Sequence, residues 1–281
     1  MQSIMDVILE LDMMVSHCAA TKNRAGYFAA LYKRMTTAVR LGIKNSAFED
    51  PKRMEQLDLI FAKRYIDAYD SYHSNGVCSA SWKFAFYCCA NNDLIVMQHL
   101  LMGINTHINL DLAIAAALTS PGTAIYSLEK DFNKINDVIS SLVDDMQECL
   151  CNVWPPMRLL EKIANGRQEA VFNFSIDKAR QASWANALLL AAMTTEQQQL
   201  YIQQMDIAVQ KLGAAILSPG ALASITLEVI RATEFEDIAR TINLIDTTVV
   251  YTCMQGFKKK MIQNSAVAEL FGIKCKLDIT W

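Results

Sequence analysis

Apolar residues in this chain recur at intervals of three and four positions, with polar residues between them, which is the spacing of one face of a helix. In residues 51–73, for example, Leu57, Phe61 and Ala68 share a face, and Arg64 borders it. Helices are predicted near residues 2–20, 24–41, 51–73, 80–90, 92–118, 124–150, 156–165, 175–193, 195–217, 219–232 and 234–254. Only residues 274–281 alternate, weakly, like a strand.

Residues that cap helices mark many of the predicted helix starts. The expected caps are Asp50 with Pro51 for residues 51–73, Asn91 or Asn92 for the central helix, Thr194 with Gln197 for residues 195–217, and Thr233 with Glu236 for residues 234–254. At its other end, the central helix is expected to stop at the sequence Ser120-Pro121-Gly122. The helices should therefore be long and separated by short loops.

The composition favours one large helical domain. The chain has 281 residues, of which 10 are Gly and 5 are Pro, whereas average usage predicts about 20 and about 14. Few residues are thus available for turns between strands. We predict an all-α, single-domain bundle of about ten to eleven helices over residues 1–255, built around a buried central helix near 92–118. Residues 256–281 are expected to form a C-terminal extension or tail.

Charge and cysteine content narrow the environment and the partners. The net charge is −3, without a basic excess, so no nucleic acid partner is expected. The eight cysteines form no CxxC pair, which favours reduced thiols and a cytoplasmic location. The N-terminal region lacks the features of a signal peptide. Residues 94–118 are long enough to span a bilayer, but their polar side chains argue against a transmembrane segment. A homo-oligomer is left open.

The most informative stretch lies in the central helix, between His99 and Asp111. At about 100° per residue, His107 falls about 80° and Asp111 about 120° from His99, with Gly103 between them. Apolar residues fill most other directions, so the helix should be buried. Buried polar groups cost a few kcal/mol each when unpaired. The three side chains are therefore expected to converge on partners, water, a ligand or a metal.

One interpretation of this cluster is a metal site. His107 and Asp111 are four residues apart, and an imidazole with a carboxylate at that spacing can bind one metal ion. The predicted site consists of His99, His107 and Asp111 as ligands of a divalent metal, zinc or iron, of Asp131, Asn105 and Arg64 as catalytic residues, and of Asn109, Asn136 and Arg180 as substrate-binding residues. The expected function is that of a metal-dependent hydrolase or lyase acting on a hydrophobic small molecule or lipid-like substrate in a buried helical pocket.

Alternative interpretations remain for the same residues. Asp131 can instead lie near the N-terminus of its helix, where a negative charge interacts favourably with the helix dipole. Residues Asn136, Ser140 and Asp144 resemble the magnesium-binding motif of class I terpene synthases, and Asp144–Glu148 resembles their Asp-rich motif, although Asp144 and Glu148 fall on a polar helix face. The third alternative is a non-enzymatic helical ligand-binding or scaffold protein, in which the polar cluster is only a core network.

The stretch from His99 to Asp111, His-Leu-Leu-Met-Gly-Ile-Asn-Thr-His-Ile-Asn-Leu-Asp, also resembles a bacterial family of unknown function. That family has a similar His-x-Leu-Leu-Gly-x-Asn-x-His-Ile-Asn-x-Asp-Leu segment. Further similar stretches are residues 28–32, 61–68, 131–136 and 179–184, so the resemblance covers about residues 25 to 245. It implies an all-helical fold and supports the candidate residues above, but it implies no particular activity.

Overall fold

The computed structural model describes residues 2–135, 153, 176–218 and 221–247, and all the regular elements in these residues are helices. The helices are α1 (Ile4–Thr21), α2 (Ala25–Lys44), α3 (Pro51–His73), α4 (Ala80–Cys88), α5 (Val96–Thr106), the π-helix η1 (His107–Leu112), α6 (Ala113–Thr119), the short 3-10 helix η2 (Gly122–Ala124), α9 (Ile176–Ala192), α10 (Thr195–Leu217), α11 (Ala221–Thr233) and α12 (Ile238–Thr247). Residues 125–135 are also helical. The predicted all-α fold is confirmed.

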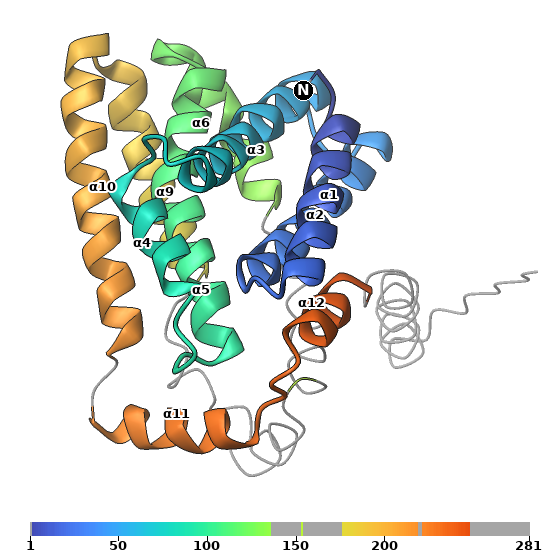
Figure 1. Ribbon diagram of the computed structural model, residues 1–281. Coiled ribbons are helices and arrows are strands. Elements are labelled where there is room, and N and C mark those ends of the chain that lie inside the picture. The colour runs from blue at the N-terminus through green and yellow to red at the C-terminus, as the bar shows by residue number, and fades with distance from the viewer. Residues whose placement is uncertain (1, 136–152, 154–175, 219–220, 248–281) are drawn as a thin grey trace, which may run out of the picture.

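The centre of the fold is the continuous helical stretch Val96–Thr119, formed by α5, η1 and α6 (Figure 1). Helices α1 and α2 lie on one side of it and the antiparallel pair α9 and α10 lies on the other, with α3 and α4 packed across it. By length and apolar composition alone this stretch is able to cross a membrane, but 78% of its most apolar window is buried inside the protein. The prediction of a buried central helix is confirmed.

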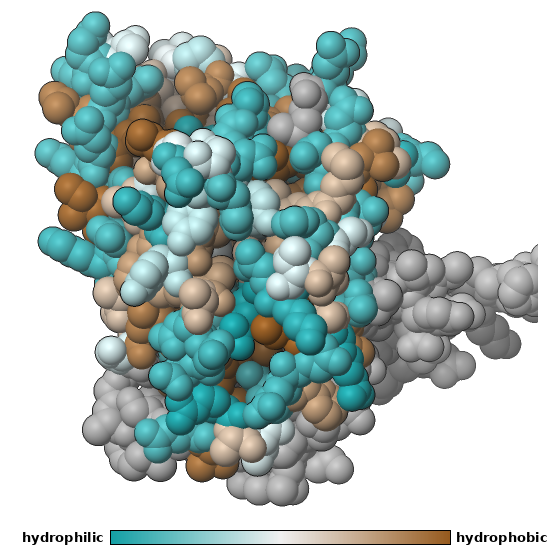
Figure 2. Space-filling view, in the orientation of Figure 1, coloured by the Kyte–Doolittle hydropathy of each residue, from teal (hydrophilic) through white to brown (hydrophobic). Residues whose placement is uncertain are grey.

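Two clusters of buried apolar side chains meet at this central stretch. Leu100 and Met102 of α5 join a cluster with α1, α2, α3 and α4. Leu110 and Leu112 of η1 join a second cluster with α6, α9 and α10. On the face shown in Figure 2, apolar residues appear as scattered spots among polar ones. The apolar residues of the central helix point in nearly all directions, which explains why the helix is buried. Both clusters include residues of this helix.

The observed caps confirm two of the predicted helix starts. The Asp50 side chain accepts a hydrogen bond from the Arg53 amide, and Pro51 occupies the first turn of α3. Thr194 and Gln197 form the predicted capping box of α10.

Two other predicted starts are wrong. The central helix begins at Val96 rather than next to Asn91 or Asn92, because the preceding residue Ile95 is extended and buried, 2% exposed. The Asn91 side chain accepts instead from the Asp93 amide.

Helix α12 begins at Ile238 rather than near residue 234. The Asp237 side chain accepts from the Arg240 amide at its start. Residues Glu234 and Phe235 bond to Val96 and Val153, which keeps this segment out of the helix.

The π-helix changes the geometry at the centre of the fold. A π-helix uses hydrogen bonds from residue i to residue i+5, so its turn is wider than that of an α-helix. The segment His107–Leu112 has this form, whereas α5 and α6 on either side are regular. Such short π segments are frequent at functional sites, and this one carries both His107 and Asp111.

Gly103, one turn before η1, allows α2 to approach the central helix closely. A Cβ atom at Gly103 would overlap the Phe28 ring of α2 and would also lie 2.9 Å from Phe28 Cβ. We expect Gly103→Ala to lower the free energy of unfolding by about 1–3 kcal/mol, because the ring and its helix must move. Urea unfolding followed by circular dichroism measures the change.

Gly213→Ala in α10 is the matched control for this substitution. A Cβ at Gly213 would come closest to the flexible end of Met102, with Cε at 3.2 Å, and would be in ordinary contact with Phe84 Cδ1 at 3.4 Å and Asn105 Nδ2 at 3.5 Å. Because alanine favours a helix over glycine by about 1 kcal/mol, this variant should be neutral or slightly more stable. Equal destabilisation by both substitutions would contradict the close packing of α2 on Gly103.

Candidate functional site

The carboxylate of Asp111 accepts hydrogen bonds from three side chains on three different elements. Arg64 Nε of α3 lies 2.8 Å from Oδ1, and Trp82 Nε1 of α4 lies 2.8 Å from Oδ2. His107 Nδ1, in the same π-helix, lies 3.1 Å from Oδ2. Asp111 is 1% exposed, so an unpaired charge would be costly there, and these three partners compensate for its burial. Arg64, which borders the apolar face of α3, thus pairs with an inward carboxylate.

His107 lies in a cage of aromatic rings. Its imidazole stacks on Phe61, with 3.6 Å between ring centroids and 9° between planes, and meets Tyr32 edge-on at 4.4 Å. The rings of Phe28, Tyr65 and Trp82 complete the cage, with centroids 5.7, 5.9 and 6.0 Å away. They come from α2, α3 and α4, so the cage brings together residues distant in sequence.

Burial keeps the His107 imidazole neutral. Burial is the main cause that lowers the pKa of His107, and Arg64 lowers it further, whereas Asp111 opposes the shift. In the neutral ring, a hydrogen on Nδ1 donates to Asp111. The other nitrogen, Nε2, then carries a lone pair, and it is buried without a hydrogen-bond partner among the described residues. The arrangement provides a basic nitrogen whose orientation a carboxylate fixes.

His99 does not join this site, so the expected convergence of His99 with His107 and Asp111 is wrong. His99 is 5% exposed and contacts the Tyr27 ring edge-on at 5.8 Å. Eight residues separate the two histidines, which places them about 12 Å apart along a helix even when they share a face. Burial lowers the pKa of His99 to about 3, with a contribution from Arg24. Within the described ranges, no group of three His, Cys, Asp or Glu side chains is placed to hold a metal ion.

Asn105 and Asn109 connect the central helix to α10. Asn105 Nδ2 donates to the Val209 carbonyl oxygen at 2.9 Å, and Asn109 Nδ2 donates to Asn105 Oδ1 at 3.1 Å. This polar pair faces α10, whereas His107 and Asp111 face α3 and α4. The two asparagines, expected at the site, thus hold a neighbouring helix in register instead.

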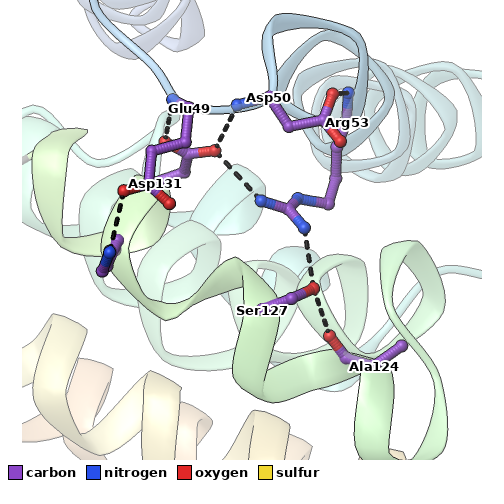
Figure 3. A network of polar contacts seen from close by, with 7 residues as sticks. Glu49, Asp50, Arg53, Ala124, Ser127 and Asp131 are labelled. Carbon is purple, nitrogen blue, oxygen red and sulfur yellow. Dashed lines mark hydrogen bonds and ion pairs between the residues drawn. The ribbon is translucent and has the colours of Figure 1, made fainter.

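Asp131 holds the start of α3 (Figure 3). Its two carboxylate oxygens accept from the amides of Glu49 at 2.7 Å and Asp50 at 2.9 Å, and Arg53 lies 3.1 Å away. Asp131 is 1% exposed, so it points inward as the sequence suggests. Its partners are backbone amides and an arginine outside the His107 cage, and it does not face His107.

The remaining candidates also lie away from the cage or cannot be placed. Arg180 donates to the Phe132 carbonyl oxygen, and its guanidinium lies 4.6 Å from the centre of the Phe132 ring. Asn136, Ser140 and Asp144–Glu148, including the terpene synthase-like motif, lie outside the described residues.

The sequence analysis missed the residues that enclose His107, above all Trp82, Phe61 and Tyr32. A signal for them exists: aromatic residues recur four positions apart in α2, as Phe28 and Tyr32, and in α3, as Phe61 and Tyr65. Two aromatic stripes on neighbouring helices, together with a buried histidine, predict an aromatic cluster. The spacing does not reveal that both stripes meet the same imidazole.

The geometry of Asp131 predicts a structural role. Asp131→Ala removes the acceptor of two backbone amides and the partner of Arg53, so we expect the free energy of unfolding to fall by about 2–3 kcal/mol. The exposed neighbour Lys130, which pairs with Glu49 at the surface, is the control, and Lys130→Ala should change stability by no more than about 0.5 kcal/mol. Urea unfolding of both variants measures this difference. Wild-type stability in Asp131→Ala would contradict the assignment.

Comparison with known proteins identifies the family but no activity. The model of a family of unknown function (DUF5995) matches residues 4–219, which include α1 to α10 and the whole His107 cage. No curated protein and no solved structure matches the chain. The match covers well over half of the sequence, in agreement with the predicted resemblance to a family of unknown function. The chain therefore belongs to the DUF5995 family.

Proposed function

We propose that this protein is an enzyme that acts on a hydrophobic small molecule with His107 as a general base. The observation that carries the proposal is the buried pair of His107 and Asp111, in which Nε2 of the imidazole has no hydrogen-bond partner among the described residues. A neutral imidazole whose Nδ1 hydrogen is held by a carboxylate is the arrangement by which enzymes take a proton from water or substrate. The reaction class is that of a hydrolase or a lyase.

For a hydrolysis, the roles of the residues follow from their positions. Nε2 of His107 takes a proton from water while the water oxygen bonds to the acyl carbon. As the acyl bond breaks, Nε2 returns the proton to the leaving oxygen, so protons balance over the cycle. Asp111 stabilises the transient imidazolium, and Arg64 and Trp82 hold Asp111 in position.

The surroundings of His107 support an apolar substrate. The imidazole is enclosed by carbon-rich rings, and its stacking partner Phe61 is only half-buried, as is Arg64. These two side chains of α3 lie between the His107–Asp111 pair and the outside. A molecule that reaches Nε2 past Phe61 must therefore contact aromatic carbon, which favours hydrophobic groups.

The donor geometry favours metal-free chemistry over the expected zinc or iron site. Asp111 already accepts three hydrogen bonds, two at Oδ2 and one from the cation Arg64 at Oδ1, so a metal at Oδ1 would lie beside a positive charge. His99 contacts a different ring, Tyr27. Nε2 of His107 thus remains as the single ready ligand in the described site, and one ligand is fewer than the three protein ligands of a catalytic zinc site.

A second candidate is a binding protein for the same class of molecule. The close stacking of His107 on Phe61 and the four other rings around it favour this alternative, since an aromatic cage suits binding as well as catalysis. Under this alternative, Nε2 accepts a hydrogen bond from the ligand and transfers no proton. Binding without turnover would distinguish it from the enzyme.

Hydrolysis of p-nitrophenyl esters with acyl chains of two to ten carbons tests the base. We expect turnover by the wild type that increases with chain length and falls about 100-fold or more in His107→Gln, because the proton acceptor is lost. The exposed His17 provides the matched control, and His17→Gln should hydrolyse the esters at the wild-type rate. Equal rates in His107→Gln and the wild type, or no turnover of any ester, would contradict a hydrolytic base.

The pH profile and the metal content provide independent checks. Since burial lowers the pKa of His107, the base form should persist as the pH falls through 6.5, and the rate should decline only at lower pH. Elemental analysis of the active protein should find less than about a tenth of an equivalent of zinc or iron. Stoichiometric metal whose removal abolishes turnover would restore the metal-dependent mechanism.

A further inference from the structure

Three side-chain oxygens next to the His107 cage are buried without hydrogen-bond partners in the described part of the chain. They are Tyr32 Oη and Thr36 Oγ1 of α2 and Asp58 Oδ2 of α3. The Tyr32 ring lies 4.4 Å from the imidazole of His107, which places the group beside the proposed base. Buried polar atoms without partners are rare and costly, so a cluster of three requires an explanation.

Tyr32 and Thr36 are one turn apart on α2, and Asp58 is about one turn before Phe61 of α3, whose ring lies 5.8 Å from that of Tyr32. Burial is the main cause that raises the pKa of Tyr32, and the Asp58 carboxyl is the next. The Thr36 hydroxyl is near enough to lower that pKa, yet the two hydroxyl oxygens do not meet in hydrogen-bonding geometry. The Asp58 carboxyl and both hydroxyls therefore lie on facing turns of α2 and α3.

Within the described residues, no cation compensates for the buried Asp58 carboxyl. Burial raises the pKa of Asp58 to about 8, and Glu55 adds to the shift, while no described cationic side chain opposes it. The arginines of the surrounding helices are engaged elsewhere: Arg34 with the Ile245 carbonyl oxygen, Arg53 with Asp131 and Arg64 with Asp111. The pairing that usually compensates for a buried carboxylate is thus missing at this position.

The chemistry of this cluster matches a primary ammonium group. An ammonium has three N–H donors and no acceptor, and the cluster offers three oxygens that can accept. The rings of Phe28 and Phe61 lie 5.9 and 5.8 Å from the Tyr32 ring, and aromatic faces attract cations. We propose that Tyr32, Thr36 and Asp58 form the subsite for a primary ammonium group on the hydrophobic molecule that His107 acts on. This inference rests on the proposed function of His107.

Binding of an ammonium should release a proton. Near neutral pH the Asp58 carboxyl of the free protein is protonated, because its pKa is raised to about 8. A bound cation stabilises the carboxylate, so the carboxyl gives its proton to the buffer as the ammonium enters. About one proton is therefore released for each amine bound, and the released proton distinguishes ionic recognition from simple apolar binding.

Titration calorimetry with 2-phenylethylamine and 2-phenylethanol tests the subsite, because these probes differ only in the ammonium and hydroxyl groups. At pH 7 we expect the amine to bind at least about tenfold more tightly than the alcohol. Titrations in buffers of different ionisation heat should report nearly one proton released for the amine and none for the alcohol. Equal affinities, or no binding of either probe, would overturn the proposal, and so would occupation of the three oxygens by water alone in a crystal soaked with the amine.

Substitutions connect the binding to the named oxygens. Asp58→Asn should reduce amine affinity to that of the alcohol and abolish proton release, whereas the exposed Asp67→Asn on the same helix should bind like the wild type. If Asp58→Asn does not fold, Tyr32→Phe and Thr36→Val provide the test, since each removes one unpaired hydroxyl. Each should weaken amine binding several-fold without lowering thermal stability. Unchanged amine affinity in these variants would exclude the subsite.

The two proposals fail in different ways. If amine binding requires Asp58 but the protein turns over neither esters nor amines, the ammonium subsite is supported and the role of His107 as a general base is refuted. If turnover requires His107 but the alcohol and the amine bind with equal affinity, the role of His107 as a general base is supported and the ammonium subsite is refuted.

Discussion

The hydrogen bonds to the Asp111 carboxylate hold the centre of this structure together. Arg64 of α3 and Trp82 of α4 each bring their helix against the central one, and His107 approaches from within the π-helix itself. A carboxylate buried this deeply is tolerated only with such partners, because each lost donor leaves charge uncompensated. The orientation of the His107 imidazole, the position of α4 and the partly exposed Arg64 all depend on this single side chain. Any chemistry at Nε2 therefore depends on Asp111 as well.

The polar residues of the central helix divide into two sets with different partners. His107 and Asp111 face α3 and α4, where aromatic rings and an arginine surround them. Asn105 donates to the backbone of α10, and Asn109 donates to the Asn105 side chain. The first set leaves a nitrogen atom available, whereas the second set holds the helices in position. This difference in partners separates candidate chemistry from the framework of the fold.

Much of the architecture could be predicted from local pattern. The periodicity of apolar residues identified the helices, and Asp50 and Thr194 marked the starts of α3 and α10, because these signals depend on neighbours in sequence. The start of the central helix could not be predicted, since the burial of Ile95 and the bonds of Glu234 depend on distant segments. The pairing of His107 with Asp111 followed from their spacing. His99 lies apart from His107 because of its distance along the helix, and it contacts Tyr27 instead. The partners of Asp131 are backbone amides, which no pattern of side chains in the sequence reveals.

The wider turn of η1 has a consequence for how the protein can vary. A short π segment inside a longer helix accommodates an additional residue without interrupting the helix. Loss of one residue from His107–Leu112 would let the stretch close into a regular helix. Each residue of the wider turn contributes less rotation than the roughly 100° of an α-helix, so α6 would keep nearly the same face toward α3 and α9. A residue lost between His107 and Asp111 would instead alter the spacing of that pair. Relatives of this chain should thus tolerate a change of length in this segment as far as the fold is concerned, but not as far as the His107–Asp111 contact is concerned.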